Sequence, residues 1–194
     1  MTVSAATPTM TTEELLALPD DGVERWLIRG QLREMPVQGM CMTVRNRWHS
    51  RIMVRVAKFL DNWLDQQPEP RGAILCGEAG CRLRRDPDTT VGIDVVYISA
   101  ELAARESDET SLIDGVPVLV VEILSPNDTQ EQIDEKSDSY LQAGVALVWV
   151  IDPHDRTVTI YRPGQEPELV NVRQELSGDP HLPGFRVPVA QLFG

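Results

Sequence analysis

The stretch Val118-Leu119-Val120-Val121-Glu122-Ile123-Leu124 is apolar except at Glu122 and lies between Pro117 and Pro126. A short apolar run enclosed by helix-breaking residues is typical of a β-strand that is buried on both faces of a sheet. Glu122 is unusual in such a strand, because a carboxylate that is buried without a partner is costly or takes up a proton. The stretch therefore predicts a central strand whose acid must face a cation.

Three partners for Glu122 are compatible with the sequence: an arginine in a salt bridge, solvent at an open strand end, or a metal ion. Asp94 favours the metal ion, because it interrupts a second β-branched run over residues 93–98. Two carboxylates on neighbouring strands repel by about 4 kcal/mol at about 4 Å in a medium of dielectric constant about 20. A divalent cation removes this repulsion and prefers oxygen ligands. The alternative is that Asp94 is an ordinary residue at a strand end.

Lys136 is the expected amine of this group. A helix is predicted over residues 128–143, with Gly144 as its C-cap. Ile133 and Tyr140 turn toward the sheet, and Lys136 lies three residues after the first and four before the second, on the same side of the helix. A lysine there can orient a water or neutralise charge on a pentavalent phosphate. The alternative is a lysine at the helix edge that extends its amine to solvent.

The elements on either side of this group complete a mixed α/β pattern. We expect an N-terminal arm over residues 1–10 and a single domain over residues 11–194. Further helices are predicted after the capping box Thr11–Glu14, over 44–65 and at 189–193, and further strands over 23–28, 31–35, 73–76, 79–84, 145–151 and 157–162. This order predicts a mixed sheet with helices on its faces.

The helix expected over residues 44–65 carries two stripes. Its apolar stripe is assigned to the core and consists of Trp48, Ile52, Val56, Phe59, Leu60 and Trp63. Its basic stripe consists of Arg47, Arg51, Arg55 and Lys58. The basic stripe is either a solvated face or a surface that contacts nucleic-acid phosphates. We expect His49, between the two stripes, to cap the helix or to lie at the surface.

Composition excludes several classes of protein. The chain has 194 residues, of which 42% are hydrophobic and 25% charged, so neither a disordered tail nor a fibrous repeat fits. No apolar run approaches the roughly 20 residues of a membrane helix, and the first residues do not predict a secretory signal. Three cysteines, Cys41, Cys76 and Cys81, lack the paired spacing of a zinc site. We therefore expect a reducing, cytoplasmic setting.

Charge is distributed unevenly along the chain. The formal net charge is −12, which is poorly suited to coating nucleic acid without specificity. Residues 24–85, however, hold 12 basic and 6 acidic side chains. A local basic surface could therefore guide a polyanion into a cleft.

These motifs resemble the putative restriction endonuclease branch of the PD-(D/E)XK nuclease superfamily. The resemblance spans roughly residues 11–194 and is carried by residues 93–96, 120–126, 135–136 with Tyr140, 143–145, 149–153 and 183–185, together with Glu24 and His49 near the start. It implies a restriction-endonuclease-like mixed sheet flanked by helices. It also implies hydrolysis of DNA phosphodiester bonds with Mg²⁺, for which Mn²⁺ can substitute, and a homodimer.

The resemblance also implies roles for individual residues. Asp94 and Glu122 would bind Mg²⁺ together with the backbone carbonyl of Ile123. The motif's usual lysine position, two residues after the second acid, holds Leu124, and Lys136 matches a lysine that this branch carries on the following helix. It would position or deprotonate the attacking water. Glu24 matches an acid that the N-terminal region supplies as a possible second-metal or water ligand.

The same resemblance directs the basic stripe, Arg47, Arg51 and Arg55, toward the DNA backbone. Two departures from the branch pattern are Ile93 in place of a proline and Leu147-Val148 in place of Glu-Tyr. Two alternatives to a DNA endonuclease stay open, the first because of Leu124 and the net charge of −12. One is a non-catalytic binding or scaffolding module that retains the fold, and the other is a metal-dependent hydrolase of a small phosphoester.

Overall fold

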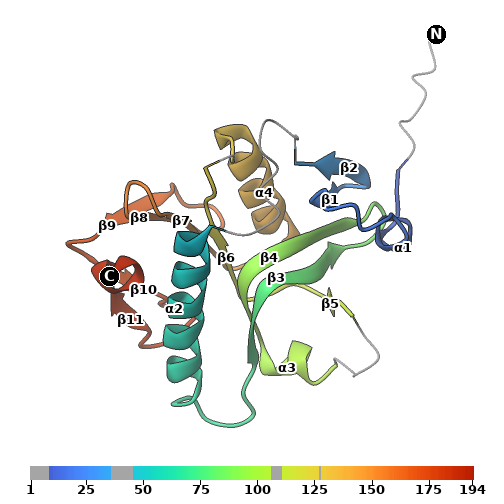
Figure 1. Cartoon of the computed structure of the whole chain (residues 1–194). Helices are drawn as coiled ribbons and strands as arrows, with labels where there is room; N and C mark the ends of the chain where they lie inside the picture. The colour runs from blue at the N-terminus through green and yellow to red at the C-terminus, as the bar shows by residue number, and fades with distance from the viewer. Residues whose placement is uncertain (1–8, 36–45, 106–110, 127) are drawn as a thin grey trace.

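The computed structural model describes residues 9–35, 46–105, 111–126 and 128–194. Residues 1–8 of the expected N-terminal arm and Cys41 lie outside the described residues. The described part is built on one large mixed sheet, with strand order β2-β1-β4-β6-β7-β8-β9; β3 also pairs with β4, and β5 pairs with β3 (Figure 1). The predicted mixed α/β fold is confirmed.

The bounds of the elements follow the sequence pattern closely. The helices are α1 (Thr12–Leu16), α2 (Arg47–Leu64), α3 (Ala100–Ala103), α4 (Gln130–Ala143) and α5 (Ala190–Phe193). The strands are β1 (Arg25–Ile28), β2 (Gln31–Glu34), β3 (Ala73–Arg84), β4 (Thr89–Ile98), β5 (Ile113–Asp114), β6 (Leu119–Ile123), β7 (Leu147–Asp152), β8 (Thr157–Tyr161), β9 (Glu168–Asn171), β10 (Glu175–Ser177) and β11 (Arg186–Pro188). The last two strands form a separate small sheet.

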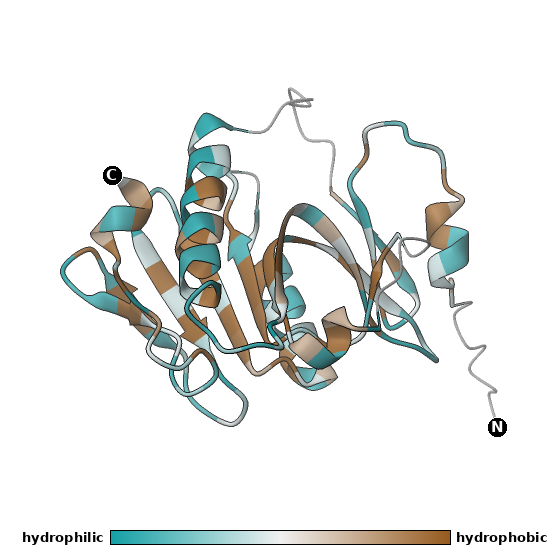
Figure 2. Ribbon diagram, turned by 90° about the horizontal axis from the view of Figure 1, so that it is seen from below, coloured by the Kyte–Doolittle hydropathy of each residue, from teal (hydrophilic) through white to brown (hydrophobic). Residues whose placement is uncertain are grey.

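The strand β6 is buried on both faces, as its apolar run predicts. Leu119 and Val121 pack with α2 and the C-terminal elements, whereas Val120 packs with Tyr140 of α4. Figure 2 shows apolar residues concentrated on the strands and on the inner sides of these helices. Each large apolar side chain buried here contributes about 1.5–3 kcal/mol. The sheet therefore holds β6 at the centre of the molecule, with one helix over each face.

The apolar stripe of α2 differs from the prediction at its first turn. Trp48 was expected in the core, but its side chain is 45% exposed, whereas His49 is 3% exposed. Successive helical residues are about 100° apart, and the side that carries Ile52 and Val56 is continued by His49 and not by Trp48. The assignment of Trp48 to the core was wrong, and so was the expectation that His49 caps the helix or lies at the surface.

A β-bulge interrupts the pairing of β3 with β4. Cys76 pairs with Val95 and Ala79 pairs with Ile93, so two residues of β3, Gly77 and Glu78, stand opposite a single residue of β4. Both residues have positive φ, 93° at Gly77 and 61° at Glu78. Glycine adopts a positive φ without steric cost, which explains the glycine at position 77. The two short strands predicted over 73–76 and 79–84 are therefore one bulged strand.

No helix in the described ranges has both the length and the apolar character needed to cross a lipid bilayer.

Candidate functional site

Asp94 and Glu122, called the acid pair below, lie where β4 and β6 stop pairing. The ladder between these strands runs from Tyr97 opposite Leu119 to Val95 opposite Val121, and the acid pair follows directly. At this point the backbone N–H of Ile123 donates to Asp94 Oδ2 at 2.8 Å. The Asp94 carboxylate thus accepts the hydrogen bond from the Ile123 N–H that a main-chain carbonyl of β4 would accept if the two strands continued to pair.

A buried histidine holds Asp94 from the side of α2. His49 Nε2 lies 3.1 Å from Asp94 Oδ2, and the two side chains are 3% and 5% exposed. Asn46 begins the helix as its N-cap, with its side chain accepting from the backbone N–H of Trp48. This cap starts α2 so that His49 faces the sheet. Nothing in the local sequence pattern predicted this contact.

Glu122 is bound by two side chains of α4. The Tyr140 hydroxyl donates to Oε1, and Lys136 Nζ lies 3.4 Å from Oε2. The side chains of Glu122 and Lys136 are 14% and 19% exposed, and the Lys136 amine also lies 5.3 Å from the ring centroid of Trp26. Among the residues that the structure describes, the cation paired with Glu122 is therefore Lys136 and not an arginine.

The charged side chains around Glu122 and Lys136 shift the pKa values of these two groups. Burial raises the pKa of Glu122 to about 7; Lys136 opposes this increase and Asp94 adds to it. Burial by itself lowers the pKa of Lys136, but Glu122 and the other nearby acids outweigh it, so the net shift is upward. At neutral pH, Lys136 is therefore an ammonium group, while Glu122 is close to the midpoint of its titration.

Two further acids act on Lys136. Glu24, half-buried directly before β1, and Glu78, half-buried in the bulge of β3, both raise the pKa of Lys136. The structure thus brings the four residues predicted as catalytic, Glu24, Asp94, Glu122 and Lys136, into one neighbourhood. It adds His49, Glu78 and Tyr140. Glu78 was not predicted, although a glycine followed by an acid inside an expected strand region is a sequence signal for a bulge.

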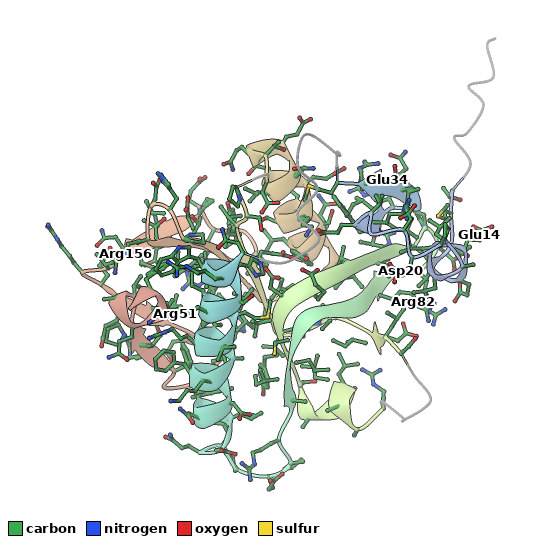
Figure 3. The ribbon with its side chains drawn as sticks, viewed as in Figure 1. Glu14, Asp20, Glu34, Arg51, Arg82 and Arg156 are labelled. Carbon is green, nitrogen blue, oxygen red and sulfur yellow. The ribbon has the colours of Figure 1, made fainter. Side chains whose placement is uncertain are left out.

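The predicted basic stripe is divided between two environments. Arg47 and Arg51 are exposed, and their guanidinium groups lie 4.9 and 5.9 Å from the ring centroid of Trp48. Figure 3 shows Arg51 on the outer surface of α2. Arg55 instead donates to the main-chain oxygen of Gln191 at 2.6 Å. Arg55 therefore fastens α2 to the C-terminal turn, while Arg47 and Arg51 face outward.

The donor set at the acid pair suits a hard divalent cation. Carboxylate oxygens from Asp94 and Glu122 and a main-chain oxygen are the ligand types that Mg²⁺ prefers. Within the described ranges, no three His, Cys, Asp or Glu side chains form a group that could hold a metal ion. Mg²⁺ typically binds one or two protein carboxylates and keeps several waters. The two carboxylates of the acid pair and a main-chain oxygen are therefore suitable protein ligands for such a hydrated Mg²⁺.

Comparisons with known proteins identify a family and a shared fold for this chain. A family model described as Uma2, putative restriction endonuclease, matches residues 12–190. The crystal structure of a putative nuclease belonging to DUF820 from Anabaena variabilis is similar, with a TM-score of 0.76 and 22% sequence identity. The match covers 95% of this chain and 97% of that chain, which shows a shared fold. The search of curated proteins gave no match.

Proposed function

The chain belongs to the Uma2 family of putative restriction endonucleases, and from this premise we propose that it is a Mg²⁺-dependent endonuclease that hydrolyses phosphodiester bonds of DNA. One observation carries the proposal. The acid pair stands where two strands diverge, and Lys136 of the next helix binds one of the two carboxylates. Two acids and an amine in one neighbourhood are the groups that metal-assisted phosphodiester hydrolysis requires.

Asp94 and Glu122 would hold the cation, with the backbone carbonyl of Ile123 as a further oxygen ligand. When bound, Mg²⁺ supplies Lewis acidity for the phosphate and lowers the pKa of an attacking water. The chain's own residues prepare this position. His49 and the Ile123 N–H hold the Asp94 carboxylate, and the Tyr140 hydroxyl holds that of Glu122.

The state of Lys136 limits its role. Its raised pKa keeps the amine protonated at neutral pH, so it does not deprotonate the attacking water. It donates hydrogen bonds and places a positive charge beside Glu122, where negative charge develops on a phosphate during hydrolysis. Of the two roles predicted for it, positioning the water is therefore the one that we propose.

DNA would approach along the outer face of α2. Arg47 and Arg51 are exposed there, and His49 on the same turn of the helix reaches Asp94. Arginines on this face can contact phosphates and compensate locally for the net charge of −12. Arg55 is a weaker candidate, because its guanidinium already binds Gln191. We also propose a homodimer, on the family resemblance, and light scattering measures it.

A plasmid assay tests the proposed function. Purified protein is expected to nick or cut plasmid DNA with Mg²⁺ or Mn²⁺. Asp94→Asn, Glu122→Gln and Lys136→Met are each expected to slow cutting by about 100-fold or more. Glu131→Gln, at an exposed position of α4, is the control and should cut like the wild type. Circular dichroism and thermal unfolding show that each variant is folded.

Three results would contradict the proposal. Cutting that persists in all three site variants would remove these residues from the chemistry. A wild-type protein that binds no Mn²⁺ at millimolar concentration and cuts no DNA would favour the non-catalytic module. Activity on a generic phosphodiester, with none on DNA, would favour a hydrolase of small phosphoesters.

A further inference from the structure

We propose that Glu78 is a further acid of this site and strengthens its hold on a divalent cation through bridging water. This inference rests on the proposed function, because it assigns a role to Glu78 at the same acid pair. It concerns a residue that lies far from Asp94 and Glu122 in the sequence and that reaches them through an irregularity of β3.

The bulge of β3 is located at the acid pair. Its two residues, Gly77 and Glu78, stand between the pairs Cys76–Val95 and Ala79–Ile93, which is the position of Asp94 on β4. A regular strand would place one residue there, with its side chain on the face set by alternation. The bulge adds a residue and redirects the side chain that follows Gly77. Glu78 is therefore brought to the level of Asp94.

Gly92 locates the carboxylate of Glu78 more closely. A Cβ at Gly92 would lie 2.9 Å from Glu78 Oε2, so the carboxylate occupies the space that a side chain at this position would fill. Gly92 is two residues before Asp94 on β4, and residues two apart in a strand share a face. The Glu78 carboxylate thus lies over β4 on the side of Asp94, one step along the strand.

The electrostatic influence of Glu78 extends to both members of the ion pair. It raises the pKa of Glu122 and also that of Lys136. Four acids, Glu24, Glu78, Asp94 and Glu122, thus act on a single ammonium group. The Glu78 carboxylate therefore lies within electrostatic reach of Glu122 and of the Lys136 amine.

Water is the means by which Glu78 would reach the cation. The described residues contain no three acidic, histidine or cysteine side chains grouped as metal ligands, so Glu78 is not a direct third ligand beside Asp94 and Glu122. A hydrated Mg²⁺ or Mn²⁺ presents waters to groups beyond its inner ligands. Carboxylates that bind such ligands from outside typically change metal affinity by about 10-fold or more.

Titration calorimetry with Mn²⁺ alone, without DNA, tests this role. Glu78→Gln keeps the size of the side chain and removes its charge, and it is expected to weaken Mn²⁺ binding by about 10-fold. Gly92→Ala keeps the charge but displaces the carboxylate, and it should weaken binding in the same direction. The double variant should bind no more weakly than Glu78→Gln, because the carboxylate that the added methyl group displaces is then already absent. Glu166→Gln, at an exposed position, is the control for loss of one negative charge.

The outcomes separate the two proposals. If Glu78→Gln binds Mn²⁺ like the wild type while Asp94→Asn does not bind it, the role of Glu78 is refuted and the proposed function stands. If the wild type binds no Mn²⁺, both are refuted. If Glu166→Gln weakens binding as much as Glu78→Gln, the effect is one of net charge, and the specific role of Glu78 is refuted. Thermal unfolding without metal accompanies each titration and identifies any variant that is not folded.

Discussion

Removal of one hydroxyl group should make the stability of this protein more sensitive to pH. The Tyr140 side chain is fully buried and its hydroxyl donates to Glu122. In Tyr140→Phe, the ring remains in the core while the carboxylate loses this donor. The consequence depends on the charge of Glu122, because a hydrogen bond to a charged group contributes about 1.5–3 kcal/mol and one between neutral groups about 0.5–1.5 kcal/mol.

The sign of the effect follows from the pKa of Glu122. Burial raises it from 4.5 to about 7, so the folded protein binds this proton more tightly than the unfolded chain does. The stability that the proton provides is fully present below about pH 4.5 and is lost as the pH rises through about 7. Tyr140→Phe removes a donor that favours the charged carboxylate, which raises the pKa of Glu122 further.

The magnitude can be measured by urea unfolding in the presence of a chelator. We expect Tyr140→Phe to lower the free energy of unfolding by about 1 kcal/mol at pH 5, where Glu122 is protonated, and by about 2–3 kcal/mol at pH 8, where it is charged. Tyr97→Phe is the matched control. It also removes a tyrosine hydroxyl, but the pKa of Tyr97 is raised by burial and not by a neighbouring acid, so its effect should not depend on pH. Equal destabilisation by Tyr140→Phe at both pH values would refute the reasoning.

Two further predictions concern α2. His49→Ala should lower the free energy of unfolding by about 1–3 kcal/mol, measured by urea unfolding, since it removes a donor from buried Asp94. It should also reduce Mn²⁺ binding, measured by calorimetry. His49→Asn should restore part of the stability and part of the Mn²⁺ binding. Arg47→Ala and Arg51→Ala should each reduce the slope of log affinity against log salt by about 1, measured by fluorescence anisotropy of a DNA duplex. An unchanged slope, or an equal reduction in the control Arg173→Ala, would contradict phosphate contacts at α2.

The sequence predicts the centre of the fold best. The apolar run around Glu122 fixes a strand buried on both faces, because there is no polar side to place toward water. The capping box at Thr11 and the C-cap Gly144, with φ of 103°, are also local signals, and both motifs are present in the structure. Lys136 was predicted to face the sheet from its spacing to Tyr140, and both side chains contact Glu122.

The parts that sequence did not predict depend on tertiary contacts. Trp48 is apolar and lies four residues before Ile52, but the side of α2 that packs on the sheet runs through His49, Ile52 and Val56 and leaves Trp48 exposed. His49 is held by an acid 45 residues away. Glu78 is placed by the pairing of two strands, and one residue of slippage in that pairing would turn its side chain to the opposite face.

The acid and the amine of this site are on different elements, since Glu122 lies in β6 and Lys136 in α4. If both were in one strand, the strand would fix the distance between them. Glu122 and Lys136 are 14 residues apart in the chain, and they meet because a helix rests on a sheet. A small sliding or tilting of α4 would therefore lengthen or shorten the gap between acid and amine while the strand itself stayed unchanged. The packing of Tyr140 and Val145 in the core thus sets how close the Lys136 amine lies to the Glu122 carboxylate.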